Sequence, residues 1–148
     1  MGRSRILAVR AAGPDHQVIT AVSDQHSYRR RPCQDCPWRV DATGTFPAEA
    51  FAHSAVTAYD MSRRTFACHQ SGRDRPATCA GFLLRGAAHN LNVRRRLALS
   101  EINMAEVEAG GVTLHPSYRA MAIANGVSPD HPALAACRDD AAYLGDDD

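Results

Sequence analysis

The sequence predicts a small, mostly α-helical (α+β) single domain with one or two short strands and a four-cysteine metal site. Its 148 residues suffice for one hydrophobic core. Most segments between turn residues show helical periodicity. Only four Phe, four Tyr and one Trp are available as large core side chains, so a metal ion would add stability that such a core lacks.

The N-terminal residues 1–28 are expected to form a flexible arm that contains one short strand. Residues 1–15 end near the breaker pair Gly13 and Pro14, and the β-branched residues of 17–23 favour a strand. We expect the metal-stabilised domain to span residues 29–138. An acidic C-terminal end follows at 139–148, where five of the ten residues are aspartate.

Helix signals recur through the middle and the C-terminal half of the chain. Thr45 is a candidate cap for a helix that continues to about residue 60, with Pro47 in its first turn. The longest predicted helix runs from Cys79 to Ser100, and Gly86 inside it costs about 1 kcal/mol relative to alanine. Shorter helical segments are expected within 103–111, 115–127 and 128–144.

The basic residues have an unusual identity. All 17 are arginine and none is lysine, while the formal net charge is only +1. High-GC coding explains most of this excess and indicates an actinobacterium, or a phage or plasmid that lives in one. No apolar run approaches the roughly 18 residues of a membrane span, and no sustained signal-peptide core is present. We therefore expect a cytoplasmic protein with reduced thiols and no membrane partner.

Four of the five cysteines form the pattern C-x2-C … C-H … C and are the candidate metal ligands: Cys33, Cys36, Cys68 and Cys79. Two cysteines in a C-x2-C turn can place both sulfurs on one metal ion, and two more ligands then complete a tetrahedron. The loop with Gly72 and Pro76 would return the second pair to the first. The expected cofactor is zinc, which would join this turn to the start of the long central helix.

Other interpretations of the cysteines stay open. Four thiolates also hold iron–sulfur clusters, and a C-x2-C pair can serve as a redox dithiol. Pro37 directly after Cys36 and the lack of a βαβ pattern argue against the redox dithiol. His69 is a possible substitute ligand, or a hydrogen-bond donor to a thiolate. Cys137 is interpreted as a small buried hydrophobic residue outside the site.

Arginines cluster in two runs and beside the cysteine turn. One interpretation is that the second run suits the C-terminal end of a helix, and that Trp38 is a core anchor. The sharper hypothesis is one basic face that contacts nucleic acid or a protein partner. The candidate contact residues are Arg29, Arg30, Arg31, Arg39, Arg85, Arg94, Arg95 and Arg96.

Motifs of common enzyme classes are missing. There is no G-x-S-x-G, H-E-x-x-H or P-loop sequence. The segment Pro32 to Cys36 matches the P-C-x-x-C half of the zinc-deaminase signature, but no glutamate stands two residues after any histidine, so the H-x-E half is absent. We therefore expect no catalytic residues, no small-molecule substrate and a protein that is not an enzyme.

Three segments resemble a family of small actinobacterial and actinophage proteins of unknown function. They are "RPCQDCPWRVD", "FACHQSGRDRPATCAGFLLRGAAHNL" and "YRAMAIANGV", and the resemblance extends from about Arg31 to Cys137. It implies that Cys33, Cys36, Cys68, His69 and Cys79 belong to one set, and it implies an actinobacterial or phage origin. It implies no activity.

Together these observations favour a small zinc-binding accessory or regulatory module that binds nucleic acid or a host protein and is phage- or mobile-element-encoded. Two alternatives are an iron–sulfur regulator that senses redox state or gas, and a structural component of a virion or complex with a purely structural zinc.

Overall fold

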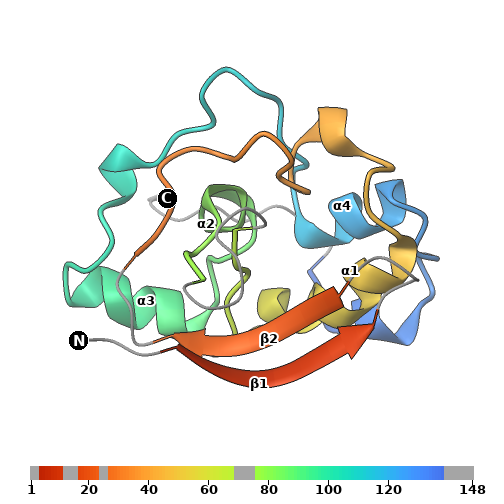
Figure 1. Ribbon diagram of the computed structural model, residues 1–148, viewed down its shortest axis with the longest axis horizontal. Helices are drawn as coiled ribbons and strands as arrows, with labels where there is room; N and C mark the ends of the chain where they lie inside the picture. Colours follow the sequence, from red (N-terminus) through yellow and green to blue (C-terminus); the bar gives the residue numbers. More distant parts are fainter. Residues whose placement is uncertain (1–3, 12–16, 24–26, 69–75, 139–148) are drawn as a thin grey trace.

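A computed structural model describes residues 4–11, 17–23, 27–68 and 76–138, which form a small, mostly helical domain with one β-hairpin (Figure 1). Short helices alternate with long connecting segments. In the view of Figure 1, α2 lies near the centre, α3 and α4 lie on either side of it, and the hairpin runs along one edge. In the described residues, no helix is long and apolar enough to cross a membrane.

The hairpin pairs β1 (Ser4–Ala11) with β2 (Gln17–Ser23) in antiparallel register, and the register shifts between Ile6 and Ala8. The strand predicted at 17–23 is confirmed. The expectation of a flexible arm over residues 1–15 is wrong for residues 4–11, because these residues form the partner strand that satisfies the backbone hydrogen bonds of β2. The hairpin also contacts α1.

The first helical region is α1 (Ala48–Ser54), which continues directly into the 3-10 turn η2 (Ala55–Ala58). Pro47, and not Thr45, occupies the N-cap position of α1. Ser117 caps α4 (Tyr118–Ala124) through its hydroxyl oxygen, which accepts a hydrogen bond from the Ala120 amide. Three further segments of the described chain are single 3-10 turns: η1 (Val40–Ala42), η4 (Met104–Glu106) and η5 (Pro132–Leu134).

The long central helix predicted from Cys79 to Ser100 is wrong, because the chain forms two helices there. α2 (Ala80–Arg85) ends at Gly86, and α3 (Leu91–Ala98) begins after Asn90. A Cβ atom at Gly86 would lie 2.5 Å from Cη2 of Trp38, so the indole occupies the space that a side chain would need. The Asn90 side chain accepts a hydrogen bond from the Val93 amide and starts the second helix.

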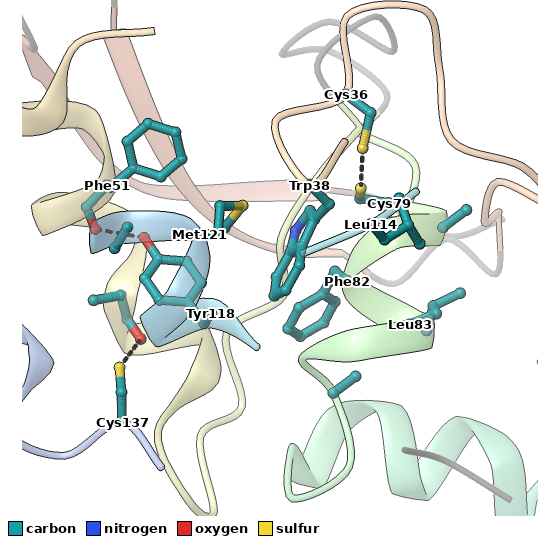
Figure 2. Packing of buried hydrophobic residues seen from close by; sticks show 14 of the residues in the cluster. Cys36, Trp38, Phe51, Cys79, Phe82, Leu83, Leu114, Tyr118, Met121 and Cys137 are labelled. Atoms are coloured by element: carbon teal, nitrogen blue, oxygen red, sulfur yellow. Dashed lines mark hydrogen bonds between the residues drawn. The ribbon is translucent and has the colours of Figure 1, made fainter. Parts of the chain in front are cut away.

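Trp38 is the centre of the core (Figure 2). Its ring is fully buried and meets the rings of Phe66 and Tyr118 edge to face, at centroid distances of 5.9 and 5.8 Å. Phe82 packs against it at 6.5 Å. Cys137 is 7% exposed and closes the core from the C-terminal side, as expected for a small hydrophobic residue. This single cluster joins α1, α2, α4 and the cysteine-bearing segments.

Candidate metal centre

The first pair of cysteines lies on one tight turn. The Cys36 amide donates a hydrogen bond to the Cys33 carbonyl at 3.1 Å, and the Arg39 amide donates to the Cys36 carbonyl at 3.0 Å. Pro32 and Pro37 flank the cysteines and restrict the backbone on both sides. Cys33 is half-buried and Cys36 is fully buried, so the turn presents both thiols close to the core.

The second pair of cysteines lies on two chain segments that pair antiparallel. Ala67 and Thr78 form a β-bridge, the Cys68 amide donates to the Ala77 carbonyl at 2.6 Å, and the Cys79 amide donates to Phe66 at 2.9 Å. Side chains alternate across such a ladder, so Cys68 and Cys79 project from the same face. They are diagonal neighbours, a relation that separates Cα atoms by about 7–8 Å. The two cysteines are therefore brought to one face by the pairing of the segments that carry them.

The two pairs meet at the surface of the core. The sulfur atoms of Cys36 and Cys79 lie 3.6 Å apart (Figure 2). The Cys33 thiol lies close enough to those of Cys36 and Cys68 for both to shift its pKa. The Cys33 thiol therefore adjoins a cysteine of each pair, and Cys36 contacts Cys79 across the two pairs. None of the five cysteines, all of which lie in the described residues, forms a disulfide.

These contacts raise the pKa of two thiols. The hydrogen bond to Cys36 is the main cause for Cys33, and the contact with Cys68 opposes it. For Cys36, the hydrogen bond with Cys33 lowers the pKa, but the hydrogen bond with Cys79, burial and the charge of Cys79 together outweigh it and raise the pKa. Both thiols are therefore protonated near neutral pH, and a metal ion that binds here must displace protons.

The cysteines approach one another without forming a complete metal site. In the described part of the chain, no three Cys, His, Asp or Glu side chains stand in an arrangement that could hold a metal ion. The four-cysteine metal site in the predicted fold is therefore not shown. His69, the candidate substitute ligand, lies outside the described residues.

Trp38 and Arg39 follow the turn and differ in environment. Trp38 is fully buried, which excludes it as a platform for stacking bases and identifies it as a core anchor. Arg39 is only 19% exposed at its side chain and forms an ion pair with Asp41 at 2.6 Å. Its Nη1 also lies 3.5 Å from the Cys33 carbonyl oxygen, so this cation adjoins the cysteine turn.

The first arginine run lies against acidic side chains. Arg30 pairs with Glu106 at 2.9 Å, and Arg31 pairs with Glu108. Arg29 is exposed. The acidic partners are about 77 residues away in the sequence, so nothing local indicated the pairing. Much of the positive charge of this run is therefore balanced within the molecule.

The second arginine run is divided between surface and core. Arg94 and Arg95 are exposed on α3, whereas Arg96 is 4% exposed. Arg96 donates hydrogen bonds to the Thr78 hydroxyl at 2.7 Å and to the Ser27 carbonyl at 3.3 Å. It therefore supports the residue before Cys79 and takes no part in a surface. The sequence could have indicated this burial, because Arg96 lies three positions after the apolar Val93 and therefore on the same face of the helix.

Arg85 is half-buried at the end of α2, where it lines a pocket with Arg119 and Arg138. The single basic face hypothesised from the sequence thus does not include all eight arginines.

The turn, the paired segments and the Trp38 core all lie within one stretch of homology. Residues 28–138 match the family of unknown function DUF6283. The chain belongs to this family. No curated protein and no solved structure matches the chain. The DUF6283 region contains all four candidate ligands and the whole described core, whereas the β1–β2 hairpin lies outside it.

Proposed function

We propose that this member of DUF6283 is a small zinc-binding accessory module without enzymatic activity, in which Cys33, Cys36, Cys68 and Cys79 bind one zinc ion. The observation that carries the proposal is the contact between Cys36 and Cys79, which are 43 positions apart, with the Cys33 thiol beside those of Cys36 and Cys68. Reduced thiols so close together, and without disulfides, are typical of a metal site in a reducing compartment.

The dimensions suit zinc. With zinc–sulfur bonds of about 2.3 Å, the sulfurs of a tetrahedral site lie about 3.8 Å apart. The 3.6 Å between Cys36 and Cys79 is close to that value. To complete the site, the Cys33 and Cys68 side chains would have to rotate so that their sulfurs reach the same ion as Cys36 and Cys79. Four thiolates fill the coordination shell, so the zinc would stabilise the fold and would have no open position for a substrate.

The charge near the cysteines is also suitable. A zinc ion with four thiolates carries two negative charges, and Arg39 lies beside the turn that supplies two of them. The pKa of Arg39 is raised mainly by its hydrogen bond to Asp41, and Cys36 and Cys33 raise it further when they are thiolates, as they would be in a zinc site. His69 remains a proposed substitute ligand, or a hydrogen-bond donor to a thiolate.

Metal analysis of the purified full-length chain tests this proposal. We expect one equivalent of zinc per chain and no colour. Serine substitutions at Cys33, Cys36, Cys68 and Cys79, one at a time, should each release most of the zinc. Cys137→Ser is the matched control, because Cys137 is also buried but lies in a different part of the core, and it should keep its zinc.

Substoichiometric zinc in a colourless wild-type protein would contradict the proposal. A brown protein after anaerobic purification would instead favour the iron–sulfur regulator.

We further propose that the module binds a protein partner in the cytoplasm of an actinobacterial host, as a phage or mobile-element product. The ion pairs of Arg30, Arg31 and Arg39 support a protein partner over nucleic acid, because arginines already paired with carboxylates contribute little to phosphate binding. The arginine-only basic composition supports the origin. If the partner is permanent, the module would instead be a structural component of a virion or complex, with a purely structural zinc.

Binding of duplex DNA and of RNA by the zinc-loaded protein, measured over a series of salt concentrations, tests the choice of partner. We expect no saturable binding at physiological salt. Saturable binding that weakens steeply with salt, and that is lost in an Arg94→Ala/Arg95→Ala variant, would favour nucleic acid. Asn92→Ala on the same helix is the matched control.

A further inference from the structure

The helix α3 turns two arginines toward solvent. Its residues Val93 and Arg96 are buried, and Arg94 and Arg95 lie on the opposite side of the helix, where both are exposed. In the view of Figure 1, α3 lies toward one end of the molecule. The outer side of this helix is therefore accessible to a partner.

Neither of these arginines pairs with a carboxylate in the part of the chain that the structure describes. Arg94 donates from Nε to the Ala88 carbonyl, which is an uncharged acceptor. By contrast, Arg30 and Arg31 each form an ion pair with a glutamate. The two positive charges on α3 are therefore not balanced by contacts with described residues.

The next acidic residue along the chain acts on the other side of the helix. Burial lowers the pKa of Arg96, and the negative charge of Glu101 opposes that shift. The Glu101 amide also donates a hydrogen bond to the Arg96 carbonyl at 2.8 Å. Glu101 thus accompanies the buried arginine and leaves the two exposed ones for an external partner.

Exposed apolar side chains flank the same helix. Among the described residues three large apolar side chains are exposed, and two of these adjoin α3: Leu99 at 54% and Met61 at 71%. Leu99 directly follows the helix. Met61 lies beside its first turn, because the Met61 amide donates to the His89 carbonyl at 2.9 Å, and the Leu91 amide donates to the Ser62 carbonyl at 2.8 Å. Met61 also has φ of 64°, a conformation that methionine rarely adopts.

One row of side chains joins the apolar groups to the charge. Leu91, Arg95 and Leu99 are four positions apart, a spacing that makes them neighbours on the helix surface. Leu91 is half-buried, whereas Arg95 and Leu99 are exposed. A partner that covers this row would bury apolar surface and meet a cation in the same contact.

The end of α3 holds Leu99 in a defined position. The Ser100 amide donates to the Leu97 carbonyl at 3.1 Å, and the amide of the following residue returns to the carbonyl of Arg96. These two bonds close the helix as a Schellman motif, with Ser100 at φ of 60° where glycine is usual. Leu99 is therefore exposed by an ordered turn and not by fraying of the helix.

Together these residues form one surface, which we call the α3 face: Met61, Leu91, Arg94, Arg95 and Leu99. We propose that the α3 face binds an acidic protein segment that also carries apolar side chains. The inference rests on the protein partner proposed above and names its chemistry.

Each part of the α3 face suits such a segment. Carboxylates of the partner would form charge-assisted hydrogen bonds with Arg94 and Arg95. Its apolar side chains would cover Leu99 and Met61, and arginine and methionine are both enriched in protein interfaces. The phosphates of a nucleic acid would meet the two arginines but would leave the two apolar side chains in water.

Selection from a random dodecapeptide library on the immobilised full chain tests the α3 face. We expect the enriched peptides to combine several aspartates or glutamates with leucine, methionine or aromatic residues. In fluorescence anisotropy, Arg94→Gln/Arg95→Gln should weaken binding of the most enriched peptide about tenfold or more, because charge-assisted hydrogen bonds are lost. Leu99→Ala should weaken it about threefold or more, because less apolar surface is buried.

Two matched controls change the same kinds of group elsewhere. Arg30→Gln/Arg31→Gln removes two charges from arginines that already face glutamates. Val40→Ala shortens an apolar side chain that is 43% exposed on η1. Each control should change the affinity for the peptide less than about twofold.

Three results would overturn the proposal: no enrichment, enriched peptides without an acidic excess, or acidic peptides whose affinity the α3-face variants leave unchanged. Duplex DNA that displaces the peptide and binds more tightly would overturn it too, and would assign the α3 face to nucleic acid.

The zinc content of the same preparation separates this proposal from the zinc site. A zinc-loaded chain that enriches no acidic peptide overturns the α3 face and leaves the zinc site in place. Acidic peptides that bind the α3 face of a zinc-free chain support the α3 face and contradict the zinc site.

Discussion

Two glycines allow Trp38 to occupy the centre of the molecule. A Cβ at Gly81 would lie 2.5 Å from the Cβ of Trp38, and one at Gly86 would lie 2.5 Å from the far end of the indole. The helix α2 therefore packs its backbone directly against the tryptophan. This contact explains a glycine at each end of so short a helix, a choice that helix propensity alone disfavours.

Substitution of Gly86 by alanine tests this contact, because the contact decides whether the unfolding free energy falls or rises. Gly86 has φ of −128°, which alanine adopts readily, so backbone entropy alone would make Gly86→Ala neutral or stabilising. Because the new Cβ would collide with the indole, we expect the variant to lose about 1–3 kcal/mol of unfolding free energy. Urea denaturation measures the change. An equal or higher unfolding free energy would contradict the proposed packing.

At the scale of the element, the junction between α2 and α3 depends on one buried amide. Asn90 is 1% exposed and caps α3 by accepting from the Val93 amide at 3.0 Å. Its Nδ2 donates to the carbonyls of Arg64 and Thr57, at 2.8 and 3.3 Å. One side chain thus starts a helix and holds the segment that leads toward Cys68.

We expect Asn90→Ala to cost about 2–3 kcal/mol, since it removes a helix cap and leaves two buried carbonyls without this donor. Asn92→Ala is a matched control, because Asn92 is half-buried and, among the described residues, its side chain donates one hydrogen bond, to the Arg63 carbonyl at 3.3 Å. That variant should lose less than about 1 kcal/mol. Chemical denaturation of both variants provides the comparison, and equal losses would refute the role of Asn90.

At the scale of the whole molecule, the C-terminal segment closes the core through groups that are buried in their neutral forms. The Cys137 thiol contacts the Ala55 carbonyl oxygen at 3.9 Å, and the Tyr118 hydroxyl donates a hydrogen bond to the Phe51 carbonyl. Burial raises the pKa of both Tyr118 and Cys137. Loss of the proton from the Tyr118 hydroxyl or the Cys137 thiol therefore destabilises the folded domain.

The stability should decrease at alkaline pH. Burial raises the pKa of Cys137 from its ordinary value of 9.0 to about 11, so the unfolded chain loses this proton first. The contribution of the Cys137 thiol to the unfolding free energy is fully present below pH 9 and is lost as the pH rises through about 11. Urea denaturation of the zinc-loaded protein across this range should show a shallower decline for Cys137→Ala than for the wild type. Parallel declines would assign the alkaline loss to other groups.

Part of the fold could be predicted from local signals. The strand at 17–23 and the helical segments around 48–58 and 118–124 depend on β-branched runs, caps and apolar spacing, which act within a few residues. The C-x2-C turn is local too, but the contact of Cys36 with Cys79 spans 43 positions, and the four-cysteine metal site stays a prediction.

Other features were decided only by tertiary contacts. The break at Gly86 depends on a tryptophan 48 positions earlier in the chain, and the pairing of Arg30 with Glu106 joins residues 76 positions apart. The pocket of Arg85, Arg119 and Arg138 has no local signature either. The sequence by itself determined where helices, strands and thiols could form, because those preferences are local. The packing around Trp38 decided which helix ends, which arginine is buried and which cations meet, because only a folded core sets those distances.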